Sequence, residues 1–81
     1  MLDIHEPIEV SAVFIRGHMK PVSFMWHRRH YKIDEVTGVY KYLVGASKCY
    51  GYTVQCGDEL YELSLNTGDM LWRLERVHEK E

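Results

Sequence analysis

The chain has 81 residues, of which 46% are hydrophobic and 27% charged, and its formal net charge is −2 at pH 7. A chain of this length supports one thin core, so we expect residues 1–81 to form a single domain. The near balance of charge excludes a polybasic nucleic-acid tail and an acidic disordered tail. No uncharged run approaches the roughly 20 residues of a spanning helix, so we expect no membrane association.

The N-terminal segment differs from a secretory signal, because acidic residues interrupt it and no basic stretch precedes an apolar one. Two cysteines are too few for a disulfide-built scaffold. We therefore expect a cytoplasmic protein in a reducing setting. The ordered core is expected over residues 8–77, with frayed ends at residues 1–6 and 78–81.

Short runs of β-branched and aromatic residues with a period of two predict strands along most of the chain. The first is expected over residues 8–16, closed by Gly17. The second carries Val22, Phe24 and Trp26 on one face.

A two-residue turn at Arg28-Arg29 would join the second strand to a third. It would create three cross-strand pairs: Trp26 with Tyr31, Phe24 with Ile33, and His27 with His30. Because such a turn needs positive φ at both central residues, two arginines suit it poorly, and we expect a longer loop or local strain.

A further strand is expected through Tyr40 and Tyr42, with a bend or bulge at Gly38 or Gly45. This strand or curved segment continues to Val44, and the two tyrosines lie beside the apolar stretch Leu43-Val44-Gly45-Ala46. We expect this stretch to be an exposed sheet edge or a partner surface.

Residues 49–77 predict a three-stranded meander. A turn at Gly57-Asp58 creates the apolar pairs Val54–Tyr61, Tyr52–Leu63 and Tyr50–Leu65. A one-residue slip would reverse that sorting of side chains between the faces. A loop over residues 66–69 would then create the pairs Leu65–Met70, Leu63–Trp72 and Tyr61–Leu74, with Glu62–Arg73 and Glu59–Arg76 on the other face.

These elements together predict an all-β fold of about six short antiparallel strands. The strands follow one another as a meander, and we expect them to form a small, partly open barrel or a strongly curved sheet. Closure of this kind removes exposed edges.

Two runs resemble the pattern of a small bacterial all-β family of unknown function. They are PVSFMWHRRHYKIDEV, from Pro21 to Val36, and YEL at residues 61–63 followed by WRLERV at residues 72–77. The family pattern is P-x-x-F-x-W-x-G-R-x-Y-x-V and later Y-E-L…G-x-W-x-L-x-R-V. It occurs in short free-standing proteins and in a tail domain of translesion-polymerase-like proteins. The resemblance supports the fold and implies no activity.

Two positions depart from that family pattern. Arg28 or Arg29 stands in place of the turn glycine, and this departure bears mainly on the conformation of the turn. Tyr40 stands where a tryptophan often follows the middle strand, which is a milder change.

A basic segment lies beside Trp26 and Tyr31. Its members are His27, Arg28, Arg29, His30 and Lys32. Cations with neighbouring rings are the groups that bind single-stranded nucleic acid. The alternative is a solvated hairpin tip whose rings lie in the core, and the absence of overall basicity favours that alternative.

The sequence offers no recognisable metal or catalytic motif. His27 and His30 are only two ligands, whereas zinc normally takes three or four from the protein. Cys49 and Cys56 are seven positions apart, so a regular strand points them to opposite faces, which argues against a shared zinc and a disulfide. A glycine-rich phosphate loop, G-x-S-x-G and H-E-x-x-H are all missing. We therefore predict no metal, no cofactor and no enzymatic activity.

The leading hypothesis is a non-enzymatic module that binds another protein or associates with itself through a sheet edge, with Tyr40 and Tyr42 as candidate contacts. The alternative is an accessory domain that binds single-stranded nucleic acid through the basic hairpin. A purely structural domain within a larger complex is the third option.

Overall fold

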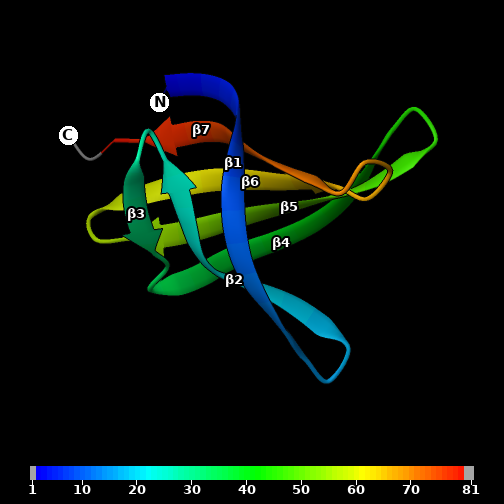
Figure 1. Cartoon of the computed structure of the whole chain (residues 1–81), viewed down its shortest axis with the longest axis horizontal. Helices are drawn as coiled ribbons and strands as arrows, with labels where there is room; N and C mark the ends of the chain where they lie inside the picture. Colours follow the sequence, from blue (N-terminus) through cyan, green and yellow to red (C-terminus); the bar gives the residue numbers. More distant parts are fainter. Residues whose placement is uncertain (1, 80–81) are drawn as a thin grey trace.

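A computed structural model describes residues 2–79, which form seven β-strands joined by short connections (Figure 1). The strands are β1 (Leu2–Ile15), β2 (His18–Trp26), β3 (Arg29–Lys32), β4 (Glu35–Val44), β5 (Ser47–Cys56), β6 (Glu59–Asn66) and β7 (Leu71–His78). They make one antiparallel sheet with the order β3-β2-β1-β7-β6-β5-β4. The predicted all-β class is confirmed, with seven strands instead of about six. Residues 2–79 include no helix of the length and apolarity needed to cross a membrane.

The sheet curls strongly into an open half-barrel. Its two edge strands, β3 and β4, are consecutive in the chain, and the link Ile33-Asp34 joins them at one end. There the N–H of Ile33 donates to the carbonyl of Val22 at 3.0 Å, and the N–H of Asp34 donates to the carbonyl of Gln55 at 2.8 Å. At the other end, the β1–β2 and β4–β5 hairpins diverge (Figure 1). The half-barrel is therefore held together at one end and open at the other.

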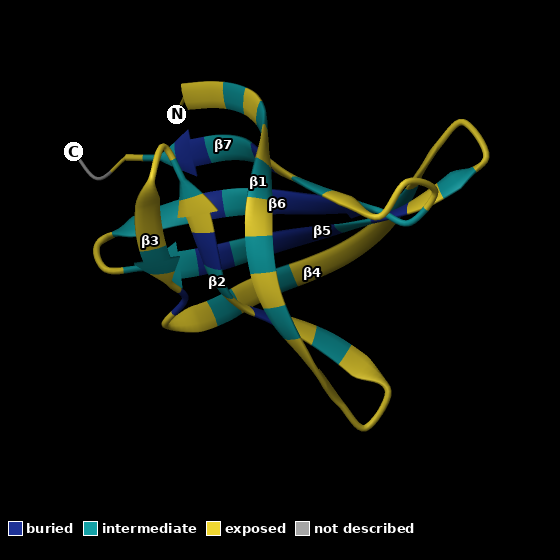
Figure 2. Ribbon diagram, in the orientation of Figure 1, coloured by how far each residue is buried: buried dark blue, intermediate teal, exposed yellow. Residues whose placement is uncertain are grey.

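The core occupies the inner face of the curled sheet and lies mainly on the central strands (Figure 2). Its buried members are Phe24, Ile33, Tyr52, Val54, Tyr61, Leu63, Leu74 and Val77. The ring of Phe24 stacks on Tyr31, with centroids 4.8 Å apart and planes 6° from parallel. Tyr61 meets Phe24 edge-on at 5.4 Å. Because strand side chains alternate between faces, the period of two in the sequence places these residues together.

The predicted β5–β6 hairpin is confirmed in every pair. Val54 lies opposite Tyr61, Tyr52 opposite Leu63, and Tyr50 opposite Leu65. Gly57 supplies a positive φ of 61° in the turn. The bend or bulge expected at Gly38 or Gly45 is present at the first of these, as a register shift between Val36 and Gly38. Gly45 lies in the turn that follows β4, with a φ of 59°.

The predicted β6–β7 register is wrong by two residues next to the turn and by three from Glu62 to the start of β6. The turn covers residues 67–70, so Leu65 pairs with Trp72 and Leu63 pairs with Leu74. The N–H of Met70 donates to the carbonyl of Asn66 at 2.7 Å, which closes this longer turn. Next to the turn, this slip of two leaves Leu63 and Leu65 and their partners on the predicted face, because the side-chain period is also two.

Charge pairs between β6 and β7 change with this register. A second irregularity, between Glu62 and Leu63, sets Glu62 opposite Arg76 instead of Arg73. Arg76 donates from Nη1 to Glu62 at 3.3 Å and from Nε to Asp3 of β1 at 3.0 Å. The guanidinium therefore joins three neighbouring strands. The predicted Glu59–Arg76 pair is absent from the register of the described strands.

The β2–β3 turn lies one residue earlier than predicted, which displaces the pairing of the two strands by two residues. The turn residues are His27 and Arg28, so Trp26 pairs with Arg29 and Phe24 pairs with Tyr31. His27 and Arg28 have φ values of 51° and 65°, so both take the left-handed conformation that suits glycine or asparagine. Stacking of His27 on the Trp26 ring, at 4.4 Å, accompanies this strained turn.

Both ends of the chain are more ordered than expected. β1 begins at Leu2, six residues before its predicted start, and pairs with β7 through Leu2–Val77 and Asp3–Arg76. Residues 2–6 and His78 thus belong to strands, although fraying was predicted for them, while Met1, Lys80 and Glu81 lie outside the described residues. Pro21 lies within β2, close to the register shift between Ser11 and Ala12, where a missing N–H is tolerated.

Replacing Arg28 by glycine should stabilise the domain by about 0.5 kcal/mol. The substitution removes a left-handed conformation that costs about 1–2 kcal/mol, less the 0.5–1 kcal/mol that glycine's greater freedom in the unfolded chain costs. Urea unfolding followed by circular dichroism measures the change. Arg29→Gly is the matched control, because Arg29 lies in β3 and should lose about 0.5–1 kcal/mol. Equal losses in both variants would contradict the assignment of the turn.

Stability should fall between pH 9 and pH 11 in part through Cys56. Burial, and then the charge of Asp34, raise the pKa of the Cys56 thiol from 9.0 to about 11. The folded state therefore disfavours the thiolate, so the contribution of this thiol is complete below pH 9 and is lost as the pH rises towards 11. The free energy of unfolding should decline less steeply over this range in Cys56→Ala than in the wild type. Identical slopes would show that the thiol is not involved.

Candidate functional site

Strand β4 forms one edge of the sheet and is the larger of the two exposed edges. In the described chain it pairs only with β5, so one row of its backbone N–H and C=O groups faces outward. Proteins usually protect such edges with short strands, charges, bulges or proline. β3, at the other edge, follows this rule, because it has four residues and includes Arg29 and Lys32. β4 also carries Lys41 and a register shift between Val36 and Gly38, but it has ten residues and exposes Val39, Leu43 and Val44.

Tyr40 and Tyr42, both predicted as contact residues, lie on the outer face of β4. Their rings stack with centroids 5.8 Å apart. Tyr40 lies opposite Gly51, and a Cβ at Gly51 would be only 2.2 Å from the Cζ of Tyr40. Tyr42 lies opposite the buried Cys49. Burial is the main cause that raises the pKa of both phenols. The two rings therefore cover the sheet as well as bordering its edge.

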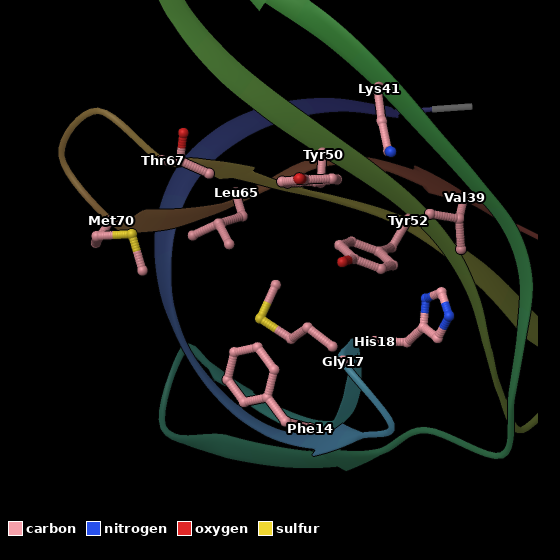
Figure 3. A pocket seen from close by; sticks show the side chains of 11 residues that line it. Phe14, Gly17, His18, Val39, Lys41, Tyr50, Tyr52, Leu65, Thr67 and Met70 are labelled. Atoms are coloured by element: carbon pink, nitrogen blue, oxygen red, sulfur yellow. The ribbon is translucent and has the colours of Figure 1, made fainter.

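A cavity of about 580 Å³ opens on the inner side of the same edge, at the open end of the half-barrel (Figure 3). Phe14 and Met19 of the β1–β2 hairpin form one wall. Val39 and Lys41 of β4 form the other wall. Tyr50, Tyr52 and Leu65 complete most of the lining. The volume lies within the range of about 300–1,000 Å³ that is typical of ligand pockets.

The edge and the cavity form one site because β4 contributes to both. Val39 and Lys41 point inward opposite Tyr52 and Tyr50 of β5, and the next inward residue, Leu43, lies opposite Lys48. Val39 has 58% and Leu43 67% of its surface exposed, which is high for aliphatic residues beside a cavity. An extended chain laid along β4 would meet backbone donors and acceptors, and its alternate side chains would face the cavity.

Sequence reasoning missed most of this site. Phe14 and Val39 belong to strands far apart in the sheet order, so no local pattern brings them together. One signal was present in the charge distribution. Residues 10–33 and 36–57 contain neither Asp nor Glu, yet they include most of the lysines and arginines. These two stretches supply the two walls of the cavity.

The basic hairpin lies at the opposite edge of the sheet from the two tyrosines. The side chains of Arg28, Arg29, His30 and Lys32 are all exposed there. His27 lies in the turn, so it does not face His30, and its Nε2 is 3.0 Å from Oε1 of Glu6. The structure thus separates the seven predicted residues into two groups.

The rings beside the basic hairpin are engaged within the fold. Tyr31 stacks on Phe24 and lies 5.4 Å from the ring of Tyr61. Trp26 is half-buried, stacks on His27 and directs Nε1 towards the carboxylate of Glu6 at 3.5 Å. Base stacking needs an open ring face, and phosphate is repelled by a carboxylate. The hairpin therefore offers cations with little of the aromatic surface that the nucleic-acid hypothesis needs.

The remaining chemical groups do not converge. Within residues 2–79, no three His, Cys, Asp or Glu side chains come close enough to hold a metal ion. Cys49 and Cys56 are both free thiols, the first buried and the second half-buried. The cavity lining that the structure describes contains His18 and Lys41 as its titratable nitrogen groups, with neither a carboxylate nor a thiol.

No protein-family model matches this chain, and it has no significant match among curated proteins or among solved structures. The resemblance to the small bacterial family therefore stays a prediction. Function must be argued from the geometry and chemistry of the site, because a fold alone does not specify it.

Gly51 and Tyr40 should be strongly coupled in stability. Gly51→Ala forces the Tyr40 ring off the outer face of the sheet and should cost about 1 kcal/mol, as is usual for a substitution that disturbs packing. In a Tyr40→Ala background the same change should be neutral or stabilising by about 0.5–1 kcal/mol, because alanine is favoured over glycine within a strand. Urea unfolding of the four proteins measures the coupling. Equal effects in both backgrounds would mean that the ring does not occupy the space above Gly51.

Proposed function

We propose that this domain is a non-enzymatic protein-interaction module that receives an extended segment of a partner protein at the edge of β4. The observation that carries the proposal is the ten-residue edge strand lying beside the 580 Å³ cavity. Val39 and Lys41 belong to both features, so a single bound segment would contact both. The position of Tyr40 and Tyr42 on the same strand supports this assignment.

Strand addition explains why these two features occur together. Hydrogen bonds between backbones supply affinity for any extended segment, and pockets for alternate side chains supply specificity. Here the row of outward-facing N–H and C=O groups on β4 would supply the first, and the cavity would supply the second. Each apolar side chain that enters the cavity would contribute about 25 cal/mol for each Å² removed from water.

The chemistry of the cavity supports binding without catalysis. General acid–base catalysis needs a titratable group within hydrogen-bond reach of the reacting proton, and nucleophilic catalysis needs a nucleophile next to a base. His18 and Lys41 are the only titratable nitrogen groups in the lining that the structure describes, and apolar and tyrosine side chains make up most of the rest. The nucleic-acid alternative has less support, because Tyr31 is stacked in the core and Glu6 lies beside the hairpin.

Blocking β4 should abolish binding of extended peptides. Random ten-residue peptides displayed in vitro are selected on the wild-type domain, and hydrogen exchange then locates each enriched peptide. We expect protection of β4 amides, and a loss of at least about tenfold in affinity for Val39→Lys/Leu43→Lys, because lysines on an edge oppose strand pairing. Leu2→Lys/Met25→Lys is the matched control, since both residues are exposed and apolar but lie on β1 and β2.

Three outcomes would contradict the proposal. The first is a selection that enriches no peptide. The second is a set of enriched peptides that protect strands other than β4, or that bind the two double variants equally well. Sedimentation at the same concentrations provides the third test. A wild-type dimer that the β4 variant dissociates would assign this edge to a second copy of the chain instead of a partner segment.

A further inference from the structure

Two lysines face the inner side of the β4–β5 hairpin, next to the proposed binding edge. Lys41 lies opposite Tyr50, and its Nζ is 5.9 Å from the centroid of that ring. Lys48 lies opposite Leu43, the next inward residue of β4. Both lysines line a second hollow of about 260 Å³ that adjoins the main cavity through Lys41 and Tyr50. They therefore place positive charge along the line that a bound segment would follow.

These charges are not neutralised by the walls of the cavity. Among the ion pairs of the described residues, none involves Lys41 or Lys48. The wall-forming stretches, residues 10–33 and 36–57, contain no carboxylate at all. A complementary partner places negative charge against such a surface, and this complementarity contributes more to specificity than to raw affinity.

The order of side chains along β4 specifies where that charge must lie. The inward residues are Val39, Lys41 and Leu43, in that order. Residues that face one another on neighbouring antiparallel strands share a face of the sheet, and opposite charges in such pairs are favourable. An added strand would therefore place an apolar residue, an acidic residue and an apolar residue at alternate positions opposite these three.

We infer that the segment bound by β4 carries a carboxylate between two apolar residues at alternate positions, and that Lys41 binds this carboxylate. The apolar neighbours enter the main cavity beside Val39 and the smaller hollow beside Leu43. This inference rests on the proposed function and adds the charge and the spacing of the partner segment. An extended peptide fits this surface better than a nucleic acid, because aliphatic side chains alternate with the lysine and a backbone edge lies beside them.

Three acetylated and amidated heptapeptides test the inference. The first has the sequence Thr-Val-Thr-Glu-Thr-Val-Thr, and the others carry Gln or Lys in place of the central Glu. Amide shifts of β4 and β5 in NMR titrations yield the dissociation constants. We expect the affinity order Glu, Gln, Lys for the wild type, with a span of about threefold to tenfold, and the reverse order for Lys41→Glu. Lys32→Glu makes the same change of net charge on β3 and should keep the wild-type order.

Selection of random peptides on the wild type and on Lys41→Glu provides a second measurement that needs no designed probe. Acidic residues flanked at alternate positions by apolar ones should be enriched on the wild type, and basic residues should replace them on the variant. The inference would be overturned if the three heptapeptides bound with equal affinity, or if Lys41→Glu kept the wild-type order of affinities. Strand addition at β4 would stand in that case.

Failure of every selected peptide to protect β4 would overturn the proposed function itself. Displacement of the peptides by a ten-nucleotide thymidine strand, with shifts at the same amides, would assign the site to nucleic acid.

Discussion

The fold depends on the corner where β3 passes into β4. Asp34 anchors this corner twice, because its N–H donates to the carbonyl of Gln55 and its Oδ2 accepts from the N–H of Gly57. These bonds tie the link between the two edge strands to the β5–β6 hairpin. One end of the curled sheet is therefore held together. β3 is only four residues long, so it cannot close the remaining seam between β2 and β4.

This constraint separates the molecule into an end that supplies stability and an end that remains available for binding. At the held end, the rings of Phe24, Tyr31 and Tyr61 pack on one another within 5.4 Å. At the open end, Phe14 is 75% exposed and lies opposite Met19, and both side chains line the cavity between the walls. The proposed binding site thus exists because the barrel is incomplete.

Charge is distributed according to the same division. Carboxylates pair with Arg76 and His78 where β1, β6 and β7 lie side by side, and one of these pairs joins Arg76 to Asp3 at the N-terminal part of β1. The stretches that form the walls of the cavity, residues 10–33 and 36–57, carry cations without carboxylates. Exposed ion pairs contribute at most about 1 kcal/mol each to stability. Their position matters more here, because the carboxylates lie away from the cavity and the lysines beside the cavity keep their positive charge. This positive surface is the one along which a bound strand would lie.

The sequence by itself determined the strand class, the inner face of most core side chains and the β5–β6 register, where Gly57 and three apolar pairs agree. It placed the β2–β3 register, and the β6–β7 register next to its turn, two residues away from the observed ones, because alternation has a period of two and does not distinguish registers that differ by two. It did not reveal the irregularity between Glu62 and Leu63, which adds a third residue to the difference. It identified Tyr40 and Tyr42 from local composition, but not Phe14, Met19 or Lys41. Only the tertiary structure placed those three residues at the site. Backbone hydrogen bonds between residues distant in the chain decide which strands become edges and which hairpins face each other.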